Sequence, residues 1–268
     1  MKKTYIPKVI HYCWFGGNEL GKKEIDCINS WKKIMPEYKI IRWDETNYDV
    51  NKNDFMKEAY KNKKWAFVSD YARLDIIYNY GGLYFDTDVE TIKKFDNLLD
   101  NECFIGFESS GYLATGLGFG AKKNNQFVKM NLDKYNNIKF DINDNNSISC
   151  PRITTELLKE MNFKIDNTYQ KNNLVTLYPA DFFCPQDFYT YKLKITNNTY
   201  SIHHYSMSWH SKRDKRWKKI SILFSRIFGK KVGDNFALVL KLPGSIIIRL
   251  KNTGFKSTFL YYKNIIRR

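Results

Sequence analysis

A predicted helix over residues 65–80 ends at two glycines, and a short apolar strand at 83–85 follows at once and leads into two aspartates. Glycine tolerates the left-handed backbone that ends a helix, so Gly81 and Gly82 can turn the chain directly into the strand. A helix joined to a strand by so short a link is a unit of an α/β fold, in which helices cover the faces of a sheet. This segment therefore places the chain in the α/β class.

The remaining hydrophobic pattern alternates between the strand period and the helix period. Strands are predicted at 8–15, 38–43, 103–107, 174–178 and 200–205, helices at 22–35, 53–62 and 153–161, and a glycine-rich loop at 115–121. Alternating strands and helices predict a mainly parallel sheet that binds ligands at the carboxyl ends of its strands.

The net charge of +16 is concentrated at one end of the chain. Residues 211–268 hold 16 Lys and Arg against 2 Asp and Glu, which leaves 28 against 26 for residues 1–210. The sequence thus predicts a nearly neutral α/β domain over 1–210 and a basic tail over 211–268. The five cysteines are widely spaced and include no CxxC pair, which is typical of a reduced, cytoplasmic protein.

The tail contains an amphipathic segment. Trp217, Ile220, Phe224, Ile227 and Phe228 can share one helical face, with Lys218, Lys219, Ser225 and Arg226 on the other. A basic amphipathic helix favours an anionic membrane surface, and packing on the domain is the alternative. We do not expect nucleic-acid binding, because the basic residues belong to no recognised motif for it. No apolar run reaches the roughly 18 residues that a spanning helix needs.

Asp86 and Asp88 are two residues apart on an extended segment, so their carboxylates point to the same side. Two such anions repel unless they share a cation, and Mg²⁺ or Mn²⁺ with a nucleotide diphosphate fits oxygen ligands. A solvated turn is the plain alternative. An EF-hand loop is excluded by Thr91 and Asn97 at its sixth and twelfth positions. A haloacid-dehalogenase-type phosphatase fits poorly, because Glu90 stands where Thr or Val is needed.

Asp70 and Arg73 are three residues apart on the helix before these aspartates and share a face. The arginine fork suits phosphate or paired sugar hydroxyls, although an ordinary ion pair is the alternative. His203 and His204 are adjacent on an extended segment, so at most one of them can join the site.

Three segments, "IPKVIHYCWFGG", "KKWAFVSDYARLDIIYNYGGLYFDTDVE" and "YSIHHYSMSW", resemble in order and spacing the blocks of the DXD-containing sugar transferases of glycosyltransferase family 32, the capsule and mannan type. More distantly, they resemble the glucosyltransferase domain of the large clostridial toxins. The resemblance covers about residues 5–210 and implies a GT-A fold, a nucleotide-sugar donor, a UDP-sugar first of all, a divalent metal and retention of anomeric configuration.

The resemblance also implies roles for individual residues. On the donor, Trp14 would stack on the base, and Asp70 and Arg73 would hold the transferred sugar. Tyr84 would lie beside the diphosphate, and Ser208 and Trp209 would close over it. Asp86 would hold the ribose and the metal shell, Asp88 would ligate the metal, and His204 would be a further metal ligand. Asp70, Arg73 and Asp88 would be the catalytic residues. Cys150 stands where the family usually has glycine, which affects the acceptor side.

These expectations describe a retaining hexosyltransferase of surface polysaccharide assembly on the cytoplasmic face of the membrane, with a lipid-linked saccharide as acceptor. A sugar-binding scaffold that has lost catalysis, and the phosphatase, are the competing hypotheses. The intact Asp70, Arg73, Asp86 and Asp88 argue against the scaffold.

Overall fold

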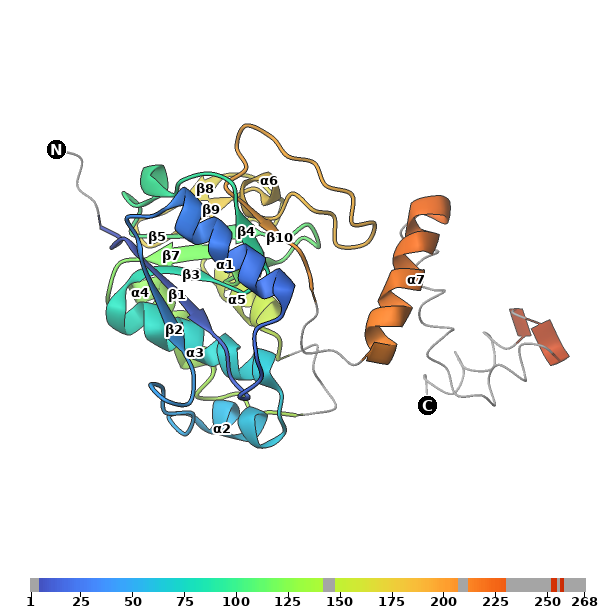
Figure 1. Cartoon of the computed structure of the whole chain (residues 1–268), viewed down its shortest axis with the longest axis horizontal. Coiled ribbons are helices and arrows are strands. Elements are labelled where there is room, and N and C mark those ends of the chain that lie inside the picture. Colours follow the sequence, from blue (N-terminus) through green and yellow to red (C-terminus); the bar gives the residue numbers. More distant parts are fainter. Residues whose placement is uncertain (1–4, 142–147, 207–211, 230–251, 255, 258–268) are drawn as a thin grey trace. The chain divides into compact units, whose positions relative to one another are not determined.

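The computed structural model describes residues 5–141, 148–206, 212–229, 252–254 and 256–257 (Figure 1). The chain divides into two compact units, of which one comprises Met1–Phe188 with Lys192–Trp209 and the other Tyr189–Tyr191 with His210–Arg268. In the described part of the chain, every strand belongs to the larger unit. All five cysteines are buried and free of disulfides.

An eight-stranded sheet forms the centre of the larger unit. Its order is β2 (Lys39–Trp43), β1 (Val9–Cys13), β3 (Gly82–Phe85), β7 (Leu117–Ala121), β5 (Cys103–Phe107), β9 (Thr176–Tyr178) and β8 (Gln170–Lys171), and β6 (Leu113–Ala114) pairs with β5. The pairings make β2, β1, β3, β5 and β9 run in one direction and β7, β6 and β8 in the other. The predicted α/β class with a mainly parallel sheet is confirmed.

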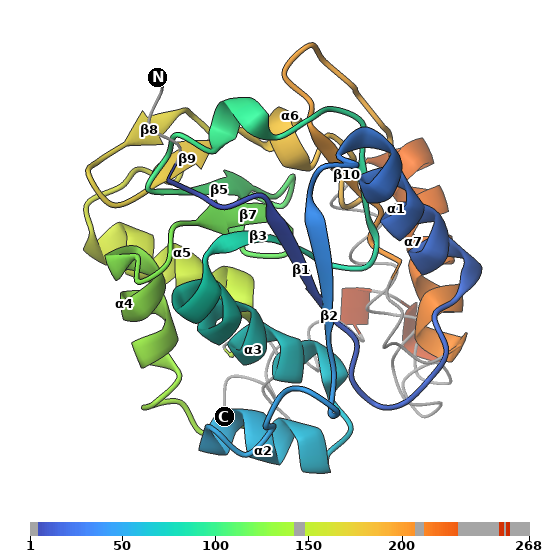
Figure 2. The same cartoon turned by 60° about the vertical axis from the view of Figure 1, so that its left-hand side comes forward.

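Helices cover both faces of this sheet (Figure 2). The helices α3 (Trp65–Tyr80), α4 (Gln126–Lys134) and α5 (Cys150–Glu160) lie on one face, and α1 (Lys22–Ile34) lies on the other. The fully buried Trp31 of α1 packs its ring 5.7 Å from Tyr12 and 5.3 Å from Phe85. The remaining short helices are α2 (Asp54–Lys61), the 3-10 turn η1 (Asp96–Leu98) and α6 (Ala180–Phe183).

A second, two-stranded sheet lies beyond the carboxyl end of β3. It pairs β4 (Val89–Thr91) with β10 (Ser201–His203) in antiparallel register. Because β4 follows β3 after a three-residue turn, this small sheet brings the end of the larger unit's chain beside Asp86 and Asp88.

The glycine-rich segment 115–121 was wrongly predicted as a loop, because Leu117–Ala121 is strand β7. Its glycines permit close packing rather than chain reversal. A Cβ on Gly120 would lie 2.7 Å from both Leu83 and Phe104 side-chain atoms, so only glycine fits between these neighbours. The large residues of the flanking strands fill the space that the glycines leave.

The second unit contains α7 (Lys212–Phe228). Within this unit, Arg226 Nε donates to the Thr190 carbonyl at 2.6 Å, and Lys218 Nζ lies 5.9 Å from the Tyr189 ring. The predicted polar face is wrong at one position, because Ser225 is buried whereas Leu223 is 55% exposed. Of these two residues, the smaller serine is the buried one. No helix in the described ranges is long and apolar enough to cross a membrane.

His11 on β1 is a buried, neutral link between three elements. Its Nε2 donates to the Gly81 carbonyl at 3.0 Å, and its Nδ1 accepts from Trp43 Nε1 at 3.0 Å. A proton on Nδ1 would face the Trp43 N–H group, and burial lowers the pKa of His11 to about 4. The ring therefore stabilises the fold only while it is uncharged.

We expect this histidine to make the fold acid-sensitive. In the unfolded chain the pKa of His11 is about 6.5, so between pH 6.5 and pH 4 the unfolded state binds more protons, and the free energy of unfolding falls as the pH falls. The loss is at most about 3 kcal/mol. Urea unfolding at several pH values should show a shallower pH dependence for His11→Gln than for the wild type. Parallel curves would contradict this assignment.

Candidate functional site

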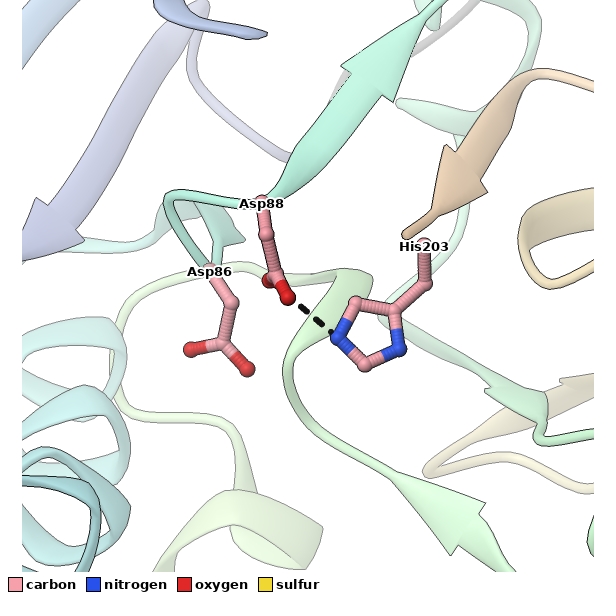
Figure 3. Close-up of side chains that lie close together, drawn as sticks. All are labelled: Asp86, Asp88 and His203. Carbon is pink, nitrogen blue, oxygen red and sulfur yellow. Dashed lines mark ion pairs between the residues drawn. The ribbon is translucent and has the colours of Figure 1, made fainter. Parts of the chain in front are cut away.

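Asp86 and Asp88 lie in the turn that joins β3 to β4. The backbone N–H of Asp86 donates to the Gly116 carbonyl at 2.9 Å, and that of Val89 donates to the Asp86 carbonyl at 3.0 Å. Residues 86–88 form a turn and not the extended segment that we expected, yet both carboxylates face the same side (Figure 3).

His203 completes a three-residue cluster with these aspartates (Figure 3). The β4–β10 register pairs His203 with Val89, which places its ring beside Asp88, and Nε2 lies 3.2 Å from Asp88 Oδ1. One ligand atom from each of the three residues lies within 4.8 Å of the others. Burial opposes the imidazolium, yet the charge of Asp88 raises the pKa of His203 well above its ordinary value.

The segment after β10 orients Asp88 through its other oxygen. The Ser206 backbone N–H and hydroxyl both donate to Asp88 Oδ2, at 2.8 Å and 3.0 Å. Tyr205, with a φ of +49°, makes the turn that aims Ser206 back at the aspartate. Burial alone would raise the pKa of Asp88, but His203 and the Ser206 bonds outweigh it and hold that pKa well below its usual range.

The structure corrects the choice between the two histidines. His204, which we expected as the further metal ligand, points away from the cluster and lies 2.8 Å from Glu90 Oε2 through its Nε2. The backbone N–H of His204 donates to the backbone carbonyl of Asp88 at 3.0 Å. Adjacent residues on a strand face opposite sides, and the register of β10 turns His203 inward.

Arg73 joins Asp70, with which it was expected to hold the sugar, to Asp86. Its Nη2 lies 3.0 Å from Asp70 Oδ1 and 3.1 Å from Asp86 Oδ1, and its Nε donates to the Ser69 carbonyl. One guanidinium therefore bridges a helix and the end of a strand. The predicted pairing of Asp70 with Arg73 is present, and Asp86 joins it.

Tyr84 was expected beside the diphosphate but is only 1% exposed. The Arg73 guanidinium carbon lies 4.9 Å from the centre of its ring. Tyr84 alternates with Phe85 on β3, so its ring faces α3 while that of Phe85 faces α1. Tyr84 therefore packs against Arg73 and stabilises its guanidinium through a cation–π contact.

Helix α5 also contacts the carboxylate of Asp70. The backbone N–H of Cys150, the first residue of that helix, donates to Asp70 Oδ2 at 3.3 Å. Burial raises the pKa of Asp70 to about 6, although Arg73 opposes this shift. Cys150, which replaces the expected glycine, turns its thiol away from Asp70 to the Thr115 hydroxyl at 2.8 Å.

Gly116 is a part of the site that we did not single out from the sequence. A Cβ at this position would lie 1.9 Å from Asp86 Oδ2 and 3.0 Å from Arg73 Nη1. Any side chain would therefore displace the Asp86 carboxylate. The glycine-rich composition of 115–121 was visible, but the close approach arises from strand pairing and no local pattern indicates it.

The donor set fits a divalent cation. Asp86 and Asp88 offer carboxylate oxygens, and His203 offers an imidazole nitrogen once a cation displaces the proton that Asp88 stabilises there. Such ligands suit Mn²⁺ and also Mg²⁺ when water completes the shell. Ser206 supplies the outer hydrogen bonds that commonly orient a ligating carboxylate. The side chain of Asp86 is 28% exposed, which leaves it open to a ligand.

The remaining residues predicted to bind the donor are Trp14, Ser208 and Trp209. Trp14 follows β1, the parallel neighbour of β3, at the same carboxyl edge of the sheet. It is half-buried, and its Nε1 donates to the Asn18 carbonyl at 2.7 Å. Its stacking on a base stays a prediction. Ser208 and Trp209 lie outside the described residues.

Comparison with known protein families gives the same assignment as the motifs. Residues 21–105 match the model of the glycosyltransferase sugar-binding region containing a DXD motif. Over this segment the chain is similar to the DXD-containing glycosyltransferases. The match spans α1 to the middle of β5 and contains Asp70, Arg73, Asp86 and Asp88. The predicted resemblance to family 32 is confirmed.

The curated relatives include yeast mannosyltransferases. The chain is 29% identical to inositol phosphoceramide mannosyltransferase 3 and 31% identical to inositol phosphoceramide mannosyltransferase 1, both of Schizosaccharomyces pombe. The alignments cover 42% and 50% of this chain but only 33% and 45% of those proteins. Mannosyl phosphorylinositol ceramide synthase SUR1 of Saccharomyces cerevisiae is 30% identical over 39% of this chain and 28% of its own length.

Among solved structures, the PaToxG glycosyltransferase is similar with a TM-score of 0.47 and 20% sequence identity. The superposition covers 58% of this chain and 69% of that one.

The two histidines offer a matched test of the cluster. We expect His203→Ala to weaken Mn²⁺ binding at least about tenfold, because it removes a ligand, and His204→Ala to change it less than about threefold. Mn²⁺ titration followed by thermal shift or by electron paramagnetic resonance measures both. Equal effects of the two substitutions would show that the β10 register does not select the ligand.

Proposed function

We propose that this chain is a metal-dependent glycosyltransferase that moves a hexose-type sugar from a nucleotide-diphosphate sugar to a saccharide acceptor with retention of configuration. The observation that carries the proposal is the bridge from Asp70 through Arg73 to Asp86, beside the ligand cluster of Asp86, Asp88 and His203. A pair of residues suited to a sugar, joined by the contact of Arg73 with Asp86 to a cluster suited to a metal ion, matches a substrate in which a sugar is joined to a diphosphate.

We assign a different role in the reaction to each group of these residues. A divalent ion held by Asp86, Asp88 and His203 would neutralise the charge that grows on the diphosphate leaving group. The Arg73 guanidinium is fixed on the Tyr84 ring and offers donors to the same region. Asp70, with its pKa of about 6, is ionised at neutral pH and can accept hydrogen bonds from sugar hydroxyls. Such preorganised groups stabilise developing charge by a few kcal/mol each.

The donor and acceptor classes follow from the relatives and the motifs together. The motifs favour a UDP-sugar, while the yeast relatives are named as mannosyltransferases, so a mannose donor is the second candidate. Those relatives act on inositol phosphoceramide, a lipid, which supports a lipid-linked saccharide acceptor for this chain. Assembly of a capsular or other surface polysaccharide on the cytoplasmic face of the membrane is the process we propose.

A panel of UDP-hexoses and GDP-mannose with Mn²⁺ tests the reaction. We expect the wild type to release nucleoside diphosphate from one donor and Asp88→Ala to lose about a hundredfold or more, because the leaving group is no longer neutralised. Asp133→Ala on α4 is the matched control, since it also removes a carboxylate. A sugar-binding scaffold would release no nucleotide from any donor, and full activity in Asp88→Ala would exclude a metal-dependent reaction at this site.

We further propose that the tail 211–268 holds the enzyme on an anionic membrane surface. Along α7, Lys219 and Arg226 are exposed, as is the apolar Leu223. An exposed leucine between basic residues suits the boundary between lipid headgroups and acyl chains better than water. This position would bring a lipid-linked acceptor within reach.

Vesicle flotation tests the tail. Deletion of residues 211–268 should reduce binding to phosphatidylserine-containing vesicles at least about tenfold, and added salt should weaken the binding of the full chain. Vesicles of phosphatidylcholine alone are the control for charge. If both forms float equally, the tail does not bind the membrane.

A further inference from the structure

The turn between β5 and β6 lies at the carboxyl end of β5 and has no role in the donor site described above. The two strands pair Phe107 with Leu113, and the next pair outward is Glu108 with Tyr112, where the Glu108 backbone N–H donates to the Tyr112 carbonyl at 2.6 Å. Gly111, with a φ of +95°, completes the turn. Residues directly opposite in an antiparallel pair project to the same face, so the Glu108 and Tyr112 side chains leave the turn on one face.

Glu108 differs from the other carboxylates around the site. Four of them have a cationic or histidine partner: Asp70 and Asp86 contact Arg73, Asp88 contacts His203, and Glu90 contacts His204. For Glu108, no ion pair exists within the described ranges, and its side chain accepts a hydrogen bond from the Ser110 hydroxyl at 2.7 Å on Oε2. A half-buried carboxylate in this state retains capacity to accept further hydrogen bonds.

The turn lies close enough to the metal cluster to share a substrate with it. The Ser109 hydroxyl is 3.3 Å from the Tyr205 hydroxyl, and the Tyr205 ring packs 4.4 Å from the ring of His203. Burial raises the pKa of Glu108, and the charges of His203 and Arg73 oppose the rise. Because β5 and β3 run in the same direction, both strands deliver their acidic residues to one edge of the sheet.

Tyr112 is 36% exposed although it stands beside buried strand residues. An exposed aromatic ring provides a flat apolar face with a polar end. A neighbouring carboxylate accepts hydrogen bonds from hydroxyl groups. Together they match the two kinds of surface on a pyranose, the C–H face and the hydroxyl rim.

We propose that the β5–β6 turn is the subsite for the acceptor saccharide, in which a sugar ring stacks on Tyr112 and one of its hydroxyls donates to Glu108. This inference rests on the proposed glycosyltransferase function. The donor contacts come from α3 and β3, whereas the turn comes from β5, so the acceptor would approach from a different part of the sheet edge.

The test separates transfer to a sugar from transfer to water. With a donor that the wild type hydrolyses, methyl α- and β-hexopyranosides are the acceptor probes. Tyr112→Ala and Glu108→Gln should each raise the KM for the glycoside at least about tenfold. Donor hydrolysis to water, and the thermal shift caused by donor with Mn²⁺, should stay within about twofold of the wild type. Tyr112→Phe should behave as the wild type, because the stacking face is kept.

The chain offers matched controls for both substitutions. Tyr169→Ala removes another exposed tyrosine. Glu102→Gln removes a glutamate that precedes the first residue of β5 and forms an ion pair with Lys122. Neither should change the KM for the glycoside.

Three results would overturn the subsite. The first is an unchanged KM for the glycoside in both Tyr112→Ala and Glu108→Gln. The second is an equal loss of hydrolysis and transfer, which indicates a structural role. The third is a wild type that hydrolyses the donor but transfers sugar to no glycoside. A wild type that releases nucleotide from no donor would instead refute the proposed function itself.

Discussion

The buried guanidinium of Arg73 is the interaction on which the site depends. It lies between Asp70 and Asp86 at 3.0 Å and 3.1 Å and rests on the ring of Tyr84. Asp70 is buried and Asp86 is half-buried, and two carboxylates so close together would otherwise repel each other. With the arginine between them, a helix and the end of its neighbouring strand are held in one geometry, and the same contact places the expected sugar-binding residues next to the expected metal ligands.

The site is assembled from segments that are far apart in the chain. Local structure provides Asp70, Arg73, Asp86 and Asp88, because α3, two glycines and β3 follow one another directly. Distant segments then orient these side chains: β7 approaches with Gly116, α5 donates the amide of Cys150, and the end of β10 brings His203 and Ser206. Each of these contacts joins segments that are distant in the sequence, so the site requires the tertiary structure.

The sequence predicted most elements well because their hydrophobic periods are strong. The strand 103–107 and the helix 65–80 were predicted with the bounds that the structure has. The glycine-rich strand β7 was missed because Gly118 and Gly120 weaken its apolar pattern, and neighbouring aromatic rings that come close only in the folded sheet fill the space at these glycines. In α7, the prediction put Ser225 on the polar face of the helix, whereas the structure buries it.

By itself, the sequence determined the α/β class, the carboxylate pair and the residues Asp70 and Arg73, since each of these follows from spacing along a few residues of chain. Only the tertiary structure decided which histidine faces the aspartates, why position 116 must be glycine, and that Glu108 and Tyr112 lie next to each other. These are outcomes of strand register and of pairing between segments distant in the sequence. A shift of one residue in a strand turns every side chain to the other face, and no local pattern around His203 and His204 encodes which register is formed.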